Sequence, residues 1–213
     1  ITLKYASQTK NYLSIYNQKL FNTFIIMKNL KTIAIALFVA VSTIATAQTK
    51  KVDASKSTVA WIGKKVTGQH NGTINLKEGA LVFKKNKLKG GTFTVDMASI
   101  NTTDLTGEYK GKLDGHLKAD DFFGTDKYPT SKLVFKKIAD KGNGVYSVTA
   151  DLTIKDVTNP IKFDVNVKGN VATTTLKIDR TKYGIKYGSG SFFDNLGDKT
   201  INDEFQLDVT LQF

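Results

Sequence analysis

The chain ends in FQLDVTLQF, residues Phe205 to Phe213, where apolar and polar side chains alternate at every position. An extended strand turns successive side chains to opposite faces, so the apolar residues of this stretch share one face and the polar residues share the other. This alternation predicts a half-buried antiparallel strand with one dry and one wet face.

The same period-two pattern recurs along the chain before this stretch. It is clear at 93–97, 146–154 and 161–167, and further strand candidates cover 58–66, 72–76, 80–84, 132–138 and 171–180. Turn signals separate the candidates, for example Lys141-Gly142-Asn143-Gly144 and Lys89-Gly90-Gly91. Only residues 107–123 break the rhythm with apolar residues at helical spacing. We therefore predict an all-β fold with a short helical excursion at 107–123.

These eight or nine strands are expected to form a single domain, because no repeat, low-complexity tract or linker interrupts them. A meander of about eight antiparallel strands with one dry face can close into a barrel, which removes exposed strand edges. The interior of such a barrel is either filled by side chains or holds a ligand. The pattern alone leaves both readings open.

Residues 27–47 have the features of a secretory signal peptide. The basic start Met27-Lys28-Asn29-Leu30-Lys31 precedes an apolar run over 33–44 and the small residues Ala45-Thr46-Ala47. The apolar run is shorter than the roughly 20 residues that a transmembrane helix needs, so we expect cleavage near Ala47 and a periplasmic or secreted product. Residues 1–26 are interpreted as an upstream extension from a misplaced start, and 48–213 as the barrel domain.

The net charge of the predicted barrel domain is smaller than that of the whole chain. The formal net charge is +12, but residues 48–213 carry 26 basic and 19 acidic residues, a net charge of +7. The lysines are interspersed with acidic residues, which favours a solvated surface over a nucleic-acid footprint. The absence of cysteine excludes disulfides, thiolate zinc sites and cysteine nucleophiles.

Catalytic and metal-binding signals are weak. His116 lies close to Asp121 and other carboxylates, and His70 is the only other histidine, so a metal site with three or four converging ligands is not predicted. We interpret His116 and Asp121 as polar residues that fasten the helical excursion to the barrel. A hydrolase or metal-dependent enzyme that uses His116 or His70 remains a competing hypothesis, for which His116→Ala would abolish turnover and spare lipid retention.

Arg180 and a group of aromatic residues are the more informative signals. Arg180 is two residues after Ile178, and alternate residues of a strand face the same side, so its guanidinium is expected on the apolar side of the sheet. A charge there needs a partner. Two roles for Arg180 are open: an internal ion pair with Asp121 or Asp194, or direct binding of an anionic group of a ligand. Phe122-Phe123, Tyr183, Tyr187 and Phe192-Phe193 lie in irregular stretches, where they either plug one end of the barrel or line its mouth.

Four ordered motifs resemble the YceI-like polyisoprenoid-binding family. They are KVTGQHNG at 65–72, HLKADDFF at 116–123 with Tyr128-Pro129 after it, LTIKDVTNPI at 152–161 and IDRTKYGI at 178–185. The resemblance covers nearly all of 51–213. It implies an exported, lipocalin-like barrel of about eight strands whose internal pore holds an isoprenoid or another acyl chain. Gly124 departs from the aspartate that family members often carry there.

From the family resemblance and the alternation of apolar side chains along the strands, we predict non-covalent sequestration or transport of a long-chain isoprenoid or similar amphiphilic lipid. No catalytic activity, metal or further cofactor is expected. The predicted channel residues are Trp61, Phe93, Phe122, Phe123, Phe135, Phe163, Ile178 and Phe193, and the predicted basic mouth is Arg180, Lys182 and Lys186. Transient membrane contact and a homodimer are both left open, and nucleic acid is not expected as a partner. A ligand-free structural barrel is the second competing hypothesis.

Overall fold

The computed structural model describes residues 18–20 and 47–213. The chain separates into two units, Ile1–Ala45 and Thr46–Phe213, and residues 18–20 of the first unit are helical. The upstream extension predicted at 1–26 and the signal peptide predicted at 27–47 lie outside the described residues, apart from 18–20 and Ala47. Among the described residues, no helix is long and apolar enough to cross a lipid bilayer.

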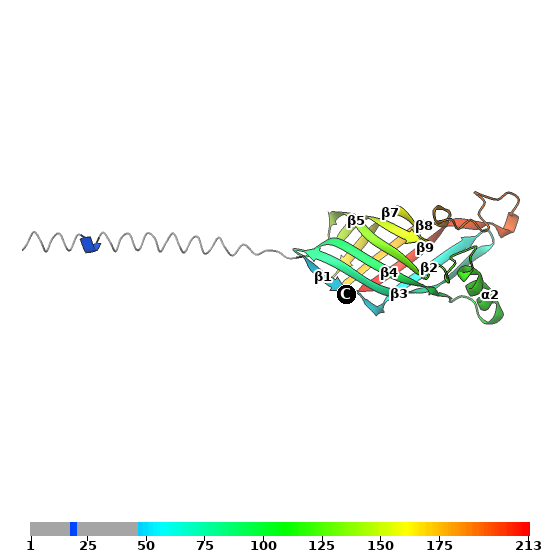
Figure 1. Cartoon of the computed structure of the whole chain (residues 1–213), viewed down its shortest axis with the longest axis horizontal. Helices are drawn as coiled ribbons and strands as arrows, with labels where there is room; N and C mark the ends of the chain where they lie inside the picture. Colours follow the sequence, from blue (N-terminus) through cyan, green and yellow to red (C-terminus); the bar gives the residue numbers. More distant parts are fainter. Residues whose placement is uncertain (1–17, 21–46) are drawn as a thin grey trace, which may run out of the picture. The chain divides into compact units, whose positions relative to one another are not determined.

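The second unit consists of antiparallel strands with one α-helix and two short 3₁₀ helices (Figure 1). The elements in chain order are β1 Gln48–Lys51, β2 Asp53–Lys65, β3 Gly68–Lys84, β4 Lys87–Thr102, α2 Gly107–Lys118, β5 Thr130–Gly142, β6 Val145–Ile154, β7 Val157–Lys168, β8 Val171–Asp179, η1 Arg180–Tyr183, η2 Gly197–Lys199 and β9 Ile201–Gln212.

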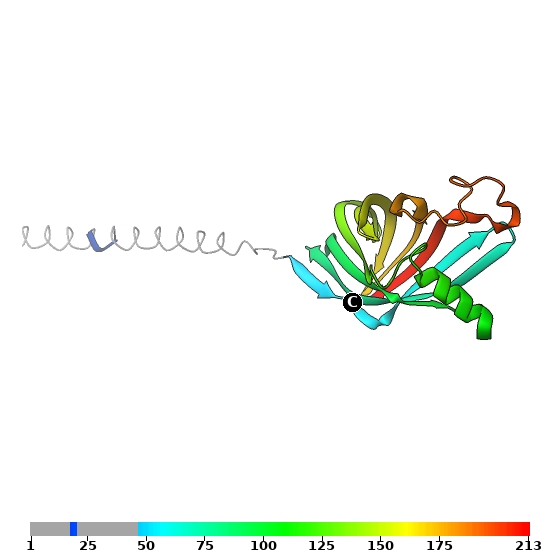
Figure 2. The same cartoon turned by 45° about the vertical axis from the view of Figure 1, so that its right-hand side comes forward.

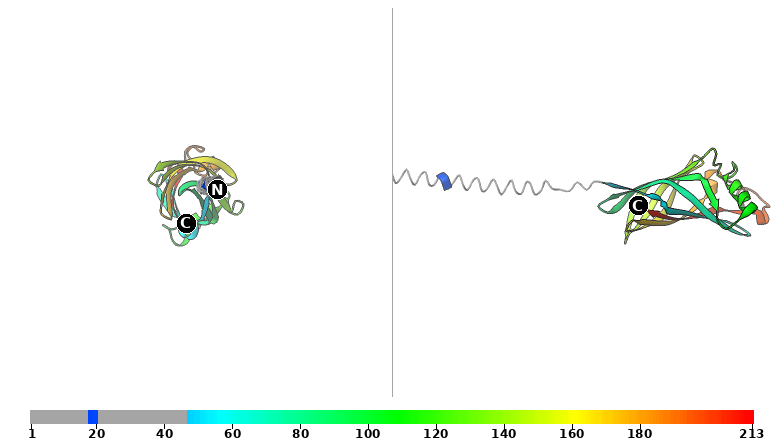
Figure 3. Two further views of the ribbon diagram at one scale, coloured as in Figure 1. Left: turned by 90° about the vertical axis from the view of Figure 1, so that its left-hand side faces the viewer. Right: turned by 90° about the horizontal axis from the view of Figure 1, so that it is seen from below.

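The strands form one closed barrel. From β2 to β9 each strand pairs with the next one in sequence, and β9 pairs back with β2, so eight strands complete the ring (Figure 3). β1 adds to the far end of β3 and continues into β2 through a bend at Val52, whose N–H donates to the Gly79 carbonyl at 2.8 Å. The predicted all-β, single-barrel, lipocalin-like fold is confirmed. All of these strand pairings lie within 48–213, so the sheet of the Thr46–Phe213 unit is complete without any residue outside that unit.

The two ends of the barrel differ. α2, the β2–β3 turn and the 184–200 loop gather at one end, which we call the α2 end (Figures 1 and 2). The other end is packed with the protein's own side chains, because Leu81, Leu88 and Val148 are no more than 1% exposed. The apolar cavity described below lies in the part of the barrel toward α2.

The local predictions are corrected at three places. The segments 72–76 and 80–84 belong to one bulged strand, β3, and α2 ends at Lys118 rather than 123. The turn expected at Lys89–Gly91 lies instead at Lys85–Asn86, whose φ angles of 51° and 59° suit a two-residue hairpin turn. Gly91 is inside β4, where an added Cβ would lie 2.7 Å from the Phe135 ring. The glycine serves close packing there, not chain reversal.

Candidate functional site

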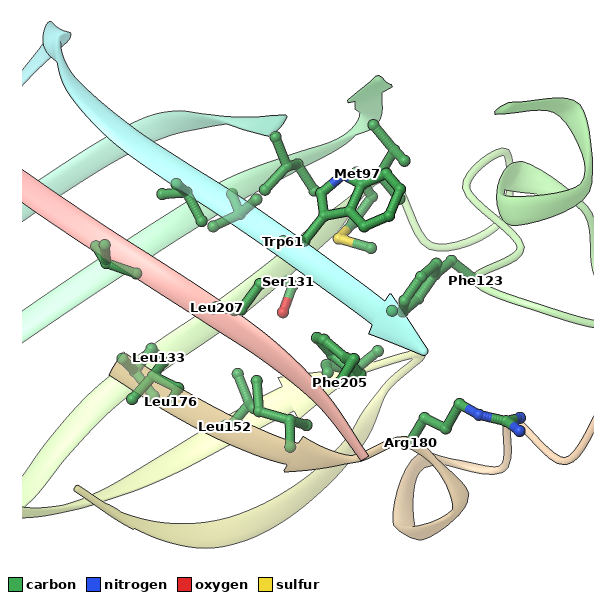
Figure 4. A pocket seen from close by; sticks show the side chains of 18 of the residues that line it. Trp61, Met97, Phe123, Ser131, Leu133, Leu152, Leu176, Arg180, Phe205 and Leu207 are labelled. Carbon is green, nitrogen blue, oxygen red and sulfur yellow. The ribbon is translucent and has the colours of Figure 1, made fainter. Parts of the chain in front are cut away.

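A cavity of about 180 Å³ occupies the barrel toward its α2 end, and its wall is almost entirely apolar (Figure 4). Its lining reaches from Leu117 and Phe123 beside α2 to Phe163 and Leu211 in the barrel interior. Every barrel strand from β2 to β9 contributes to the wall, since the inward positions of each strand carry apolar residues. The interior is therefore hollow at this end, in agreement with the ligand-holding reading of the pattern.

The structure brings most of the predicted channel residues together on this wall. Seven of the eight line the cavity, namely Trp61, Phe93, Phe122, Phe123, Phe135, Phe163 and Ile178. Trp61 fits because Gly72 faces it, where a Cβ would lie 2.5 Å from the indole ring. The indole N–H donates to the Thr73 carbonyl at 3.2 Å, so the ring is held on the wall. Binding of lipid by these residues stays a prediction.

The eighth residue, Phe193, is corrected. It is 50% exposed in the 184–200 loop and does not line the cavity. The physical reason is that this loop bends outward from the end of the barrel, so the alternation that turns side chains inward does not extend to it. Its neighbour Phe192 is 47% exposed and Tyr187 is 48% exposed. These three rings neither plug the barrel nor line the cavity.

Arg180 is buried at the cavity wall. A short 3₁₀ turn begins at this residue, because the Asp179 carboxylate accepts the Thr181 N–H at 3.0 Å and Gly184 ends the turn at a φ of 76°. The turn directs the guanidinium inward, where the side chain is only 2% exposed. The expectation that β8 itself continues to Arg180 is therefore wrong, although the inward direction is right.

The guanidinium acts as an internal lock. It donates to three backbone carbonyls, Nε to Asn202 at 3.1 Å, Nη1 to Ile185 at 2.9 Å and Nη2 to Ile201 at 3.1 Å. Asp203 Oδ1 lies 3.6 Å from Nη2, so the ionic partner is Asp203 and neither Asp121 nor Asp194. Arg180 is thus a lock between the η1 turn and the start of β9, and its role as a head-group ligand stays a prediction, which these internal contacts do not favour.

Charge at this lock is balanced. Burial lowers the pKa of Arg180, while the negative charges of Asp203 and Asp179 act in the opposite direction. Burial by itself would raise the pKa of Asp203, but hydrogen bonds from Ser189 and Ser191 and the charge of Arg180 outweigh it and lower the pKa. Both groups keep their charge at neutral pH, and the pair compensates itself inside the protein.

The other two predicted mouth residues also lie elsewhere. Lys182 and Lys186 do not line the cavity. The ammonium of Lys182 approaches Asp179 at 3.9 Å, and that of Lys186 lies 4.5 Å from the centre of the Phe192 ring. Both lysines are in the outward part of the chain after Arg180. A basic ring around the mouth is therefore not what the structure shows.

An irregular stretch of the β2–β9 pair contributes polar residues to the cavity lining. The register of this pair shifts between Gly63 and Lys65, which leaves Asn202 and Glu204 opposite Lys64 in an irregular stretch. These three polar residues line the cavity and are exposed to solvent. Sequence reasoning missed them, because the shift depends on pairing between distant strands. We call this stretch, Lys64, Asn202 and Glu204, the mouth, and treat it as the candidate entrance to the cavity.

Aromatic rings close the cavity on the side of α2. Phe122 and Phe123 follow the helix, and their ring centres are 5.2 Å apart. Phe123 meets Phe205 of β9 at 6.2 Å, and His116 of α2 meets Phe122 at 5.4 Å. The chain of rings joins the helix, the segment after it and the barrel wall, and it forms the roof of the cavity.

Lys155 holds this roof from the β6–β7 turn. Its ammonium donates to the carbonyls of Asp120 and Phe122, both at 2.8 Å. Gly124 shapes the same segment with a φ of 56°, a left-handed conformation in which its N–H reaches the Ala119 carbonyl at 2.8 Å. Glycine suits that conformation, which gives a structural reason for glycine at this position.

The two histidines occupy different places outside the cavity. His116 Nδ1 is 4.0 Å from Asp121 Oδ1, longer than a hydrogen bond, and its ring packs against Tyr187 and Phe122 instead. The expected fastening by hydrogen bonds from His116 and Asp121 is corrected to fastening by ring packing. His70 Nδ1 binds Asp104 at 2.9 Å on the surface. Among residues 18–20 and 47–213, no three His, Asp or Glu side chains converge as a metal site would require.

Comparison with known proteins agrees with this architecture. The YceI-like domain family matches residues 51–213. The chain belongs to the YceI-like family. UPF0312 proteins of Shewanella denitrificans and Staphylococcus aureus strain USA300 are 35% and 36% identical to it over 98 and 109 residues, covering 46% and 45% of this chain and 49% and 56% of those proteins. The chain spans about half the length of the curated relatives it matches.

Two solved structures share the fold of this YceI-like barrel. BcnA of Burkholderia cenocepacia matches with a TM-score of 0.57 at 24% identity, over 75% of this chain and 98% of BcnA. A polyisoprenoid binding domain from Saccharophagus degradans matches with a TM-score of 0.51 at 16% identity, over 76% and 95% of the two chains. At these identities both likenesses concern the fold.

Proposed function

We propose that this YceI-like barrel binds the chain of an isoprenoid or a similar long-chain amphiphilic lipid without catalysis, and sequesters or transports it. The observation that carries the proposal is the cavity, an almost wholly apolar space whose single buried cation, Arg180, is already neutralised and hydrogen-bonded. Apolar enclosed space of this kind favours hydrocarbon over water. The name of the Saccharophagus neighbour, a polyisoprenoid binding domain, supports the ligand class.

The volume bounds how much hydrocarbon fits. A cavity of about 180 Å³ has room for roughly a dozen water-sized groups, and each buried methylene contributes about 0.8 kcal/mol. About ten enclosed carbons would contribute about 8 kcal/mol, which corresponds to micromolar affinity only before the ordering costs of binding are subtracted, so contacts outside the cavity must add to the affinity. A longer chain would place its remaining carbons outside this volume. We therefore expect partial enclosure, with the rest of the molecule at or beyond the mouth.

The polar head of the ligand is expected at the mouth. Lys64, Asn202 and Glu204 are exposed there and include both charges and an amide. Arg180 is a weaker candidate, because three of its five N–H groups donate to backbone carbonyls and Asp203 balances its charge. We further propose cleavage of the 27–47 signal peptide near Ala47 and a periplasmic or secreted location, with the ligand taken from a membrane and no cofactor besides it. On this proposal 1–26 is not part of the exported protein.

The single tryptophan of the chain makes the proposal directly testable. Trp61 lines the cavity, so a fatty acid or prenol brominated near the chain end should quench its fluorescence once the chain enters. Native mass spectrometry of protein purified from cells should show a co-purifying lipid that organic extraction removes, and the same masses report whether the protein is a dimer. An apo mass together with no quenching by any brominated chain would overturn the proposal.

A further inference from the structure

The exposed large apolar side chains of the barrel are unevenly distributed. The set, over residues 47–213, is Val66, Tyr109, Val134, Val157, Tyr187, Phe192 and Phe193. All except Val134 lie on elements of the α2 end: the β2–β3 turn, α2, the start of β7 and the 184–200 loop (Figure 1). We call these six residues the apolar rim. Scattered exposed apolar residues are ordinary, but their collection at one end marks an interaction surface.

The apolar rim adjoins the mouth of the cavity. The N–H of Ile201, a cavity-lining residue, donates to the Gly188 carbonyl of the loop at 2.8 Å. The Val66 N–H donates to the Thr200 carbonyl at 3.1 Å, which ties the β2–β3 turn to the same place. The loop that carries the exposed rings is therefore joined by backbone hydrogen bonds to the start of β9, next to Asn202 of the mouth.

Charge on this loop is balanced. Residues 184–200 contain two lysines, Lys186 and Lys199, and two aspartates, Asp194 and Asp198. Lys186 lies over the Phe192 ring, an arrangement in which the ring can enter an apolar layer while the ammonium stays in water. A net-neutral loop with exposed aromatic rings favours a partner that attracts through apolar contact rather than through opposite charge.

We infer that the apolar rim is a docking surface for a lipid bilayer, which it contacts by shallow insertion of Phe192 and Phe193 beside the mouth. The inference rests on the proposed function, because a bilayer is the phase that holds an amphiphilic ligand before a carrier extracts it. Docking at the mouth lets the chain pass from bilayer to cavity with little exposure to water. The neutral loop predicts docking to uncharged head groups and little dependence on salt.

The test is flotation of the Thr46–Phe213 unit with phosphatidylcholine vesicles and with vesicles that also contain phosphatidylglycerol. We compare the parent unit with the double variant Phe192→Ser/Phe193→Ser and with Val134→Ser, an exposed apolar residue on the barrel wall. The parent and Val134→Ser should float with both vesicle types, and the double variant should lose about tenfold or more of its bound fraction. Circular dichroism verifies the fold of each sample.

Uptake of N-phenyl-1-naphthylamine from solution separates docking from cavity binding. The double variant should bind this apolar dye like the parent, since neither phenylalanine lines the cavity. A parent that does not float, a double variant that floats like the parent, or flotation that requires phosphatidylglycerol and disappears in high salt would each overturn the docking surface. Flotation of a parent that binds no dye or lipid would support docking and overturn the proposed function.

Discussion

The guanidinium carbon of Arg180 lies 5.6 Å from the centre of the Phe122 ring. Arg180 joins the η1 turn to the start of β9, and Phe122 belongs to the roof of the cavity. Cation–π contact between them connects the internal lock to the cavity wall. Loss of the lock should therefore affect both the stability of the barrel and the order of the roof.

Replacement of Arg180 should be strongly destabilising. Arg180→Lys keeps a charge but cannot reach three carbonyls in one plane, so we expect the free energy of unfolding to fall by about 2–4 kcal/mol. Urea denaturation measures the loss. Lys182→Met, an exposed position in the same turn, is the control and should change stability by less than about 0.5 kcal/mol. Equal stability of Arg180→Lys and the parent would contradict the lock.

Lys155→Met should loosen the roof of the cavity. The substitution leaves the carbonyls of Asp120 and Phe122 without their donor, so amide exchange over 119–128 should accelerate and a bound lipid should dissociate faster. Stability should fall by about 1 kcal/mol. Lys136→Met, which removes a wall lysine paired with Asp151 at 3.3 Å, is the matched control. If amide hydrogen exchange over 119–128 is unchanged in Lys155→Met, contacts other than the Lys155 hydrogen bonds stabilise the roof.

Phe163→Lys tests the inward face of β7. The side chain is 8% exposed and lines the cavity, so an ammonium there must enter an apolar space without a partner. We expect an unfolded protein or a folded one that takes up no lipid. The neighbouring Lys162→Met changes the outward face and should leave both properties intact. A folded Phe163→Lys protein with normal uptake would refute the assigned face.

Tyr183→Phe should stabilise the barrel. The ring is 1% exposed and its hydroxyl is buried without a hydrogen-bond partner. Removal of that hydroxyl should raise the free energy of unfolding by up to about 1 kcal/mol at neutral pH. A lower stability of the variant would mean that the hydroxyl has a favourable contact.

The same residue predicts a pH dependence. Burial raises the pKa of Tyr183 from 10.0 to about 12 in the folded state. A raised folded-state pKa gives a contribution that is complete below pH 10 and is lost as the pH rises to about 12. The parent should therefore lose stability more steeply than Tyr183→Phe over this interval, which unfolding curves at a series of alkaline pH values measure.

Much of the barrel could be predicted from side-chain alternation. Leu152 and Ile154 of β6 and Leu207 of β9 face inward as their parity requires. Local turn chemistry was a poorer guide, because Gly90 and Gly91 resemble a turn but serve close packing within β4. The true turn, Lys85-Asn86, carries no glycine. Glycine alone does not distinguish a reversal of the chain from a close contact between side chain and backbone.

Part of the candidate site could also be predicted from the sequence, and part could not. The alternation of side chains identifies Phe163 and Ile178 as cavity residues, but it does not reveal that the partner of Arg180 is Asp203. Phe192 and Phe193 follow one another in sequence with no periodic pattern around them. Their outward position depends on where the loop leaves the barrel, which no local pattern encodes.

The amino-acid sequence by itself determined half-buried antiparallel strands with one apolar face, because alternation of polarity acts residue by residue along each strand, and its four motifs resemble a family whose fold is a closed barrel. Only the tertiary structure decided which end is packed and which is hollow, where the mouth opens and what neutralises Arg180. Those features arise from the register between β2 and β9 and from contacts between segments far apart in the chain. Such contacts follow from closure of the whole barrel, so no single stretch specifies them.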